Sequence, residues 1–288
     1  MEKHLLLTVS EQKSSLQGAR FLAGFLSNKD VVKLTLFYTM PRPAELWDDE
    51  DKAGKLRKQE DAIRKGAAKA SEALEEARKE VLKLGFSEEK VLVQLQMRQF
   101  GKVKDILEEG ERGLYDAIVL GKRGLNWFEE AFDGSVSREI IESRRNCPIW
   151  ICRRPNADRK GVLLCMDGSD ASYRAAEHTG LMLGNEQRHT VKIFVVKSRA
   201  LEAPPDVIIA RGRELLAKSR VPNVRITASA VEAFSPSKAI VREAEEGGYA
   251  AVVVARADKE KSLMDRLIMG SVTMNLFREI ENAALWVA

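Results

Sequence analysis

The stretch FGKVKDILEEGERGLYDAIVLG, residues 100–121, returns later in the chain in altered form. Its counterpart is FSPSKAIVREAEEGGYAAVVVA at 234–255, and Phe, Lys, Ile, Gly and Tyr recur at one offset of 134 residues (234 minus 100). In both copies a segment with helical spacing leads into a short apolar run, the pattern of a helix followed by a buried strand. Because a repeated pattern of this kind indicates copies of one fold, the sequence predicts two tandem α/β domains.

The repeat continues on both sides of this stretch. GSVS at 134–137 matches GSVT at 270–273, and CPIWI at 147–151 matches AALWV at 283–287. Near the starts of the copies, HLLLTVS at 4–10 faces GVLLCMD at 161–167, an offset of 157 (161 minus 4). Because the offset then falls to 134, the first copy contains 23 additional residues (157 minus 134).

The additional residues fall within 47–84, a segment dense in Ala, Glu, Lys and Leu, which are strong helix formers. Apolar residues recur there every three or four positions, at Ala70, Leu74, Ala77, Val81 and Leu84. This spacing predicts one long helix with a single apolar stripe, ended by Gly85. The charged residues on the other face are interpreted as a solvated surface.

Five apolar runs in each copy have the length of strands and alternate with helical segments. They are 5–9, 34–38, 91–96, 117–121 and 149–152 in the first copy, and 162–166, 191–196, 225–229, 251–255 and 285–287 in the second. Such alternation is typical of parallel strands covered by helices. We expect two tandem open parallel five-stranded sheets with helices on both faces. The polar linker 153–160 divides the chain into domains at 1–154 and 155–288.

Composition and charge argue against several classes of protein. The 47 Lys and Arg residues against 43 Asp and Glu residues leave a net charge of +4, without a basic block of the kind that nucleic-acid readers show. The first residues become polar too soon for a signal peptide, and the three cysteines have no paired or CxxC spacing. No apolar run approaches the ~20 residues needed to cross a bilayer. We therefore expect a cytoplasmic protein without a nucleic-acid or membrane partner.

A spaced set of glycines follows the strand predicted at 117–121: Gly121-x2-Gly124-x9-Gly134-Ser135. In open parallel sheets, ligands bind beyond the carboxyl ends of the strands. Glycines there let the backbone approach a ligand, and free amides at a helix N-terminus attract phosphate oxygens. A purely structural alternative is a tight strand exit followed by a helix that Ser135 caps.

The second copy has lost most of this set. It keeps Gly270-Ser271, but Ala255 stands in place of Gly121, and Asp258 or Glu260 stands near the position of Gly124. A carboxylate at that position repels phosphate. The second Gly-Ser pair is therefore interpreted as a helix cap, and the first set as a phosphate cradle.

On these motifs the chain resembles the universal stress proteins, as a tandem of two such domains. The most specific element is the G-x2-G-x9-G-[ST] pattern of the ATP-binding branch, which the first copy satisfies. The resemblance implies a Rossmann-like, adenine nucleotide alpha hydrolase-like fold. It also implies an aspartate after the first strand, in a D-G-S-x-x-S context, that contacts the nucleoside. Asp167 to Ser172 reproduce that context in the second copy, whereas Ser10 occupies the position in the first.

The resemblance implies a nucleotide site in the first domain, for ATP with Mg2+. Its residues are Gly121, Arg123, Gly124, Gly134, Ser135 and Val136 at the phosphates and Ser10 near the nucleoside. Weaker candidates in the second domain are Asp167, Gly270 and Ser271. The resemblance further implies that the two domains pair through their last strands as an intrachain pseudo-dimer, with Trp150 and Trp286 packed there. A homodimer stays open.

Catalytic and metal-binding residues are not evident. His4, His178 and His189 have no partner motif for acid-base chemistry and are interpreted as structural or surface residues. The histidines and cysteines also lack metal-ligand spacing. We expect no enzyme, or at most weak ATP hydrolysis, and a stress-response binding and signalling protein. The alternative is an interaction module in which both pockets are empty and the long charged helix recruits a partner.

Overall fold

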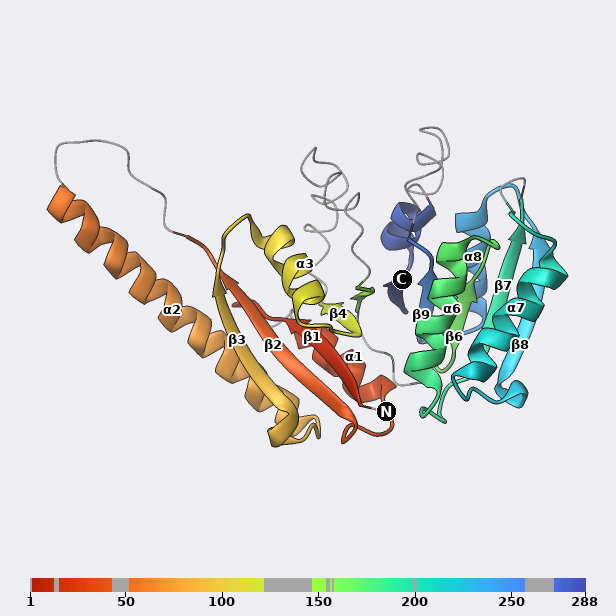
Figure 1. Cartoon of the computed structure of the whole chain (residues 1–288), viewed down its shortest axis with the longest axis horizontal. Coiled ribbons are helices and arrows are strands. Elements are labelled where there is room, and N and C mark those ends of the chain that lie inside the picture. Colours follow the sequence, from red (N-terminus) through yellow and green to blue (C-terminus); the bar gives the residue numbers. More distant parts are fainter. Residues whose placement is uncertain are drawn as a thin grey trace. The chain divides into compact units, whose positions relative to one another are not determined.

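The computed structural model describes residues 2–12, 16–42, 52–121, 147–153, 156, 158–198, 201–256 and 272–288 (Figure 1). The chain divides into two compact units. The N-terminal unit comprises residues 2–19 and 32–147, and the C-terminal unit comprises residues 20–31 and 148–288. Helix α1, Gln17–Phe25, contributes residues to both units.

The sheet of the N-terminal unit is parallel, with strand order β3-β2-β1-β4. The strands are β1 Lys3–Thr8, β2 Val32–Met40, β3 Val91–Met97 and β4 Ala117–Leu120. The helices are α2 Lys52–Lys83, the 3-10 turn η2 Glu88–Lys90, and α3 Lys102–Arg112. Leu5, Leu6 and Leu7 are successive residues of β1 and all fully buried, so both faces of this strand are covered.

Helix α2 confirms the predicted apolar stripe at four of its five positions, while Leu84 lies directly after the helix and is half-buried. Ala70, Leu74, Ala77 and Val81 are buried where α2 packs on β2 and β3. Gly66 lies level with the end of β2, since a Cβ there would be 3.2 Å from the sulfur of Met40. The helix continues beyond this edge of the sheet over residues 52–65, about 20 Å at 1.5 Å per residue (Figure 1).

The C-terminal unit has the strand order β5-β10-β9-β6-β7-β8. Its strands are β5 Ile149–Ile151, β6 Val162–Cys165, β7 Val191–Lys197, β8 Ile226–Glu232, β9 Ala251–Val254 and β10 Ala284–Val287. Its helices are α6 Asp170–Leu183, α7 Pro205–Lys218, the 3-10 turn η3 Asn223–Arg225, and α8 Pro236–Glu246; residues 272–279 are also helical. All pairs in this unit are parallel except β10 with β5, which is antiparallel. The expected pairing of the two final strands is thus confirmed.

The internal repeat extends to individual hydrogen bonds. The Tyr115 hydroxyl donates to Glu109 at 3.2 Å, and the Tyr249 hydroxyl donates to Glu243 at 3.2 Å. Both pairs join the last part of a helix, α3 or α8, to the residue two positions before the next strand, β4 or β9. The mixed α/β class with parallel sheets and the repeat are therefore as the sequence predicts.

Two stacked tryptophans form the centre of the β5 and β10 pairing. The rings of Trp150 and Trp286 lie 3.8 Å apart, nearly parallel, and both side chains are fully buried. Phe25 of α1 meets Trp286 edge-on at 5.3 Å. The indole N–H of Trp150 donates to Nε2 of His178 at 3.0 Å, which supplies the partner that a buried indole needs. The two tryptophans thus pack the strand pairing, as expected.

The end of α1 is held in the C-terminal unit by Glu186 and His189. Glu186 is buried and accepts from the backbone N–H of Ser27 at 2.6 Å and from the Ser27 hydroxyl at 2.9 Å. His189 accepts at Nδ1 from the backbone N–H of Gly161 at 3.0 Å. Its Nε2, 2.8 Å from the carbonyl oxygen of Phe25, therefore carries the proton and donates. The neutral ring joins two distant segments.

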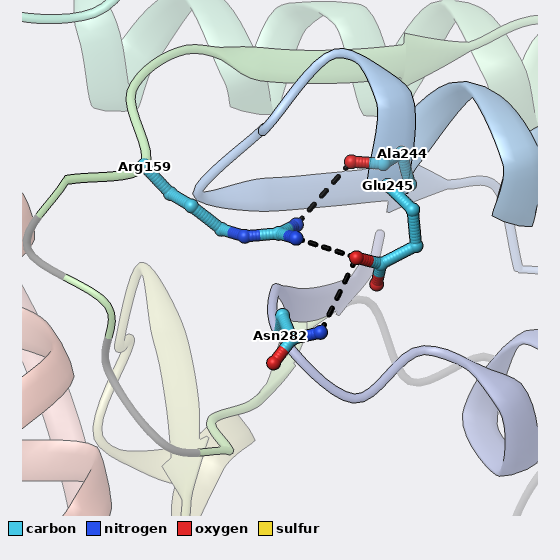
Figure 2. Close-up of polar contacts among 4 residues, drawn as sticks. All are labelled: Arg159, Ala244, Glu245 and Asn282. Atoms are coloured by element: carbon cyan, nitrogen blue, oxygen red, sulfur yellow. Dashed lines mark hydrogen bonds and ion pairs between the residues drawn. The ribbon is translucent and has the colours of Figure 1, made fainter.

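The polar linker ends at an anchored arginine (Figure 2). Arg159 donates to the carbonyl oxygen of Ala244 at 3.3 Å and to Glu245 at 2.5 Å. The Asn282 amide donates to the same Glu245 oxygen at 3.2 Å. The cation lies at the C-terminal end of α8, where it also interacts favourably with the helix dipole. Arg159 therefore fixes the chain where the second copy begins.

The buried histidines predict that stability falls as the pH falls. Burial lowers the pKa of His178 from 6.5 to about 3, and burial also lowers the pKa of His189. Unfolded histidines bind protons below pH 6.5 that the folded ones do not, so this stability is present above pH 6.5 and is lost below it. We expect the free energy of unfolding to fall by up to about 1.4 kcal/mol per pH unit for each histidine.

Urea denaturation between pH 6.5 and pH 5 measures this slope, above the range in which carboxylates titrate. The control is His178→Gln, which keeps an acceptor for the Trp150 indole but has no titration in this range. If the free energy of unfolding changed equally with pH in His178→Gln and in the unchanged protein, His178 would not be a source of the pH dependence.

Candidate functional site

The strand order places one candidate site in each unit. From β1 the chain adds β2 and β3 on one side and then returns to add β4 on the other side. In the C-terminal unit, β6 likewise has β7 on one side and β9 on the other. Ligands of open α/β sheets bind beyond the carboxyl ends of the strands where the order reverses. The candidate sites are thus the ends of β1 and β4, and the ends of β6 and β9.

Two predicted residues lie at the carboxyl edge formed by β1 and β4. Gly121 is buried and directly follows β4, and Ser10 is half-buried two residues after β1. Helix α1 begins close to this edge, because a Cβ at Gly18 would lie 2.7 Å from Leu7 and 3.0 Å from Val119. The other predicted phosphate residues lie outside the described residues: Arg123, Gly124, Gly134, Ser135 and Val136.

Three further polar residues lie at the same edge of the N-terminal unit, and the sequence did not single them out. The Tyr38 hydroxyl, at the end of β2, donates to Oε1 of Glu11 at 3.1 Å. Burial and then the contact with Glu11 raise the pKa of Tyr38, while the nearby Arg98 acts in the opposite direction. The Arg98 backbone N–H donates to the carbonyl oxygen of Met40 at 2.9 Å. These contacts depend on the register between neighbouring strands, which the sequence does not show. Only the position of Glu11 next to Ser10 pointed to this group of residues.

The aspartate of the C-terminal unit is part of a helix start. Oδ1 of Asp167 accepts from the backbone N–H of Ser169 at 3.0 Å and from its hydroxyl at 2.6 Å. The Ser169 oxygen in turn accepts from the backbone N–H of Ser172 and caps α6. The D-G-S-x-x-S motif thus has a complete local role as a turn and cap. A nucleoside contact at Asp167 stays a prediction.

The other predicted residues of the C-terminal unit follow β9 in the sequence. Gly270 and Ser271 lie outside the described residues. At the end of β9, Ala255 occupies the position that corresponds to Gly121, and the backbone N–H of the next residue, Arg256, donates to the carbonyl oxygen of Ala288 at 2.7 Å.

The three histidines lie in structural settings. Nε2 of His4 lies 2.9 Å from the Thr35 hydroxyl, and burial lowers the pKa of His4. His178 and His189 hold the tryptophan pair and the end of α1. Within the described ranges, no group of three or more His, Cys, Asp or Glu residues is arranged to hold a metal ion. Among the helices that the structure describes, none has the length and apolar character that crossing a membrane requires.

Gly168 provides a test of the helix start beside Asp167. Its φ is +87°, and a Cβ would lie 3.1 Å from Ile208 and 3.2 Å from the backbone nitrogen of Ala203. We expect Gly168→Ala to lower the free energy of unfolding by about 1–3 kcal/mol, because the backbone is strained and the space is filled. Gly24→Ala is the matched control, since a Cβ there meets nothing within 4 Å. Equal midpoints of urea denaturation for the two variants would contradict this account.

The comparisons with known proteins agree with this architecture. The family model described as the universal stress protein family matches residues 1–153 and 159–287. A protein of unknown function from Pseudomonas aeruginosa PAO1 is similar in structure, at 16% identity over 99% of this chain and 92% of that chain, with a TM-score of 0.53. A proposed universal stress protein from Pseudomonas aeruginosa UCBPP-PA14 is similar at 16% identity, over 99% and 92% of the two chains, with a TM-score of 0.52.

A shorter structure, a universal stress protein in complex with cAMP, is 22% identical over 45% of this chain and 96% of that chain, with a TM-score of 0.37. No curated protein matches the chain in sequence. At these identities the solved structures show the fold alone. The family model, in contrast, covers both copies of the repeat, and the chain belongs to the universal stress protein family.

Proposed function

We propose that this chain is a tandem universal stress protein that binds one ATP-type nucleotide, with Mg2+, in its first domain. The domains are 1–154 and 155–288, paired as an intrachain pseudo-dimer. The observation that carries the proposal is the position of Gly121. This first glycine of the spaced set is buried directly after β4, where the strand order reverses.

The chemistry of the glycine set supports phosphate as the group bound. Gly121, Gly124 and Gly134 let backbone amides approach an anion, and Ser135 adds a hydroxyl donor. In the proposal Arg123 pairs with a phosphate oxygen, and Val136 contributes the amide that follows Ser135. In the proposal Ser10, two residues after the adjacent strand β1, lies on the nucleoside side.

The second domain is proposed to bind no nucleotide of this kind. Its Asp167 carboxylate is engaged by Ser169, and Ala255 stands at the position of Gly121. Asp258 and Glu260 also follow in the sequence and add negative charge where a phosphate needs donors. In this proposal Gly270 and Ser271 serve as a helix cap, and the domain stabilises its partner.

The proposed role is binding and signalling in the cytoplasm during stress rather than catalysis. General acid-base chemistry needs a titratable group against the substrate, and histidine is the usual one. All three histidines here hold structural contacts, and His4 lies at the amino end of β1, opposite the carboxyl edge of the candidate site. At most, slow hydrolysis of bound ATP is expected.

One observation favours the second candidate function, a scaffold with empty pockets. Helix α2 continues over residues 52–65 beyond the end of β2, so it offers a surface that the sheet does not cover. In this alternative α2 recruits a protein partner whether or not nucleotide is present. Nucleotide titration separates the two candidates.

Calorimetric titration of ATP with Mg2+ tests the proposed function. We expect one site per chain in the unchanged protein and a loss of affinity of at least about 100-fold in Gly124→Asp, because a carboxylate then faces the phosphates. Asp167→Asn is the control in the second domain and is expected to keep the same affinity. Absence of binding in the unchanged protein would refute the nucleotide proposal and favour the scaffold. Two equivalent sites per chain would refute the asymmetry.

A further inference from the structure

Glu11 is held in place at the carboxyl edge of the N-terminal sheet. Beyond the end of β1, the Val9 backbone N–H still donates to the carbonyl oxygen of Phe37 at 2.8 Å, so the chain continues alongside β2. This alignment brings Glu11 to Tyr38, whose hydroxyl donates to Oε1 at 3.1 Å. Glu11 is exposed, and its second oxygen makes no hydrogen bond to any residue in the described ranges. The carboxylate therefore has one oxygen fixed and one oxygen open to a ligand.

Tyr38 is suited to hold this carboxylate at neutral pH. The side chain is buried, and burial raises the pKa of its phenol above 10.0. The hydroxyl therefore keeps its proton and acts as a donor to the carboxylate. Because Tyr38 lies within β2, its position is set by the sheet rather than by a loop.

Arg98 adds a positive charge beside this pair. It directly follows β3, and its backbone is fixed to Met40 of β2. Its Nε is buried and has no hydrogen-bond partner among the described residues. A buried N–H without an acceptor costs free energy, which an acceptor on a ligand removes. The edge thus offers a carboxylate acceptor and a guanidinium donor close to Tyr38.

At the three corresponding positions, the C-terminal unit has no carboxylate, no phenol and no guanidinium group. At the repeat offset of 157 residues, Glu11 corresponds to Gly168 and Tyr38 to the buried Val195 (168 minus 11, and 195 minus 38). The residue that directly follows β8, as Arg98 follows β3, is Ala233. The cluster is therefore not part of the shared scaffold. It occurs in the unit that also carries the full glycine set.

The position of the cluster matches the sugar rather than the phosphates. Gly121 lies at the end of β4, and Tyr38 lies at the end of β2, with β1 between them. Neighbouring strands are about 4.8 Å apart, so the two ends are separated by about 10 Å, a span for an extended nucleotide rather than for free phosphate. Acidic side chains at such edges accept hydrogen bonds from ribose hydroxyls in dinucleotide-binding folds.

We propose that Glu11, positioned by Tyr38, accepts hydrogen bonds from the ribose hydroxyls and makes the first domain selective for ribonucleotides over 2′-deoxyribonucleotides. Arg98 balances the charge of the carboxylate and donates to an acceptor on the nucleoside. This inference rests on the proposed function, because it assumes that a nucleotide occupies the β1 and β4 edge. Glu11 and Arg98 are binding residues in this proposal, and Tyr38 is a positioning residue.

The test compares the affinities for ATP and 2′-deoxy-ATP, each with Mg2+, by calorimetry on the full chain. The unchanged protein should prefer ATP by roughly 10-fold or more, the range for a hydrogen bond to a charged group. Glu11→Gln should abolish most of that preference, and Tyr38→Phe should reduce it. Glu89→Gln, an exposed substitution in η2 before β3, is the matched control and should keep it. Thermal denaturation of each variant verifies that it folds.

The outcomes separate this inference from the proposed function. An equal preference for ATP in Glu11→Gln and in the unchanged protein would overturn the role of Glu11 and leave the nucleotide site standing. An equal loss of affinity for both nucleotides in Glu11→Gln would show a general charge effect and overturn the ribose contact. Absence of ATP binding in the unchanged protein would overturn both proposals.

Discussion

The parallel pairing of β1 with β2 on one side and β4 on the other is the constraint on which the N-terminal site depends. This pairing requires a strand that is apolar on both faces, and Leu5, Leu6 and Leu7 meet that requirement. Once β1 lies between these neighbours, the carboxyl ends of β1 and β4 lie side by side. Short segments after the strands can then bring the polar residues of the site close together, because the buried strands fix where these segments begin.

The C-terminal unit has the same strand order, but polar residues at the end of β6 stabilise the start of α6. Asp167 and Ser169 form the turn and cap of α6, so Oδ1 of Asp167 and the Ser169 hydroxyl oxygen are engaged within the chain. In the N-terminal unit, Glu11 instead presents a carboxylate to solvent, held by Tyr38 from the neighbouring strand. The two copies thus show how one scaffold supports either a carboxylate that caps its own helix or a carboxylate that is held from the neighbouring strand and faces solvent.

The sequence predicts the fold well because its main signals are local. Strand and helix geometry directly explain the apolar runs and the spacing of Ala70, Leu74 and Ala77. The internal repeat also shows the alternation of strands and helices twice. The contact of Tyr38 with Glu11, 27 positions apart, is different, since it depends on how β1 and β2 are aligned. In the sequence Tyr38 resembles any other residue of an apolar strand. The same limit applies to His189 and Phe25, 164 positions apart, which no local pattern connects.

Helix α2 shows how a segment that extends past the sheet keeps its helical structure. An isolated helix as short as residues 52–65 is marginal in water, because nucleation is costly. Here the packed half of α2 supplies the nucleus, so each added residue needs only propagation, which strong helix formers favour. Local ion pairs such as Arg64 with Asp61 at 3.1 Å add little, since both side chains are exposed. The helix therefore extends past the carboxyl edge of the sheet as a continuation of its packed half.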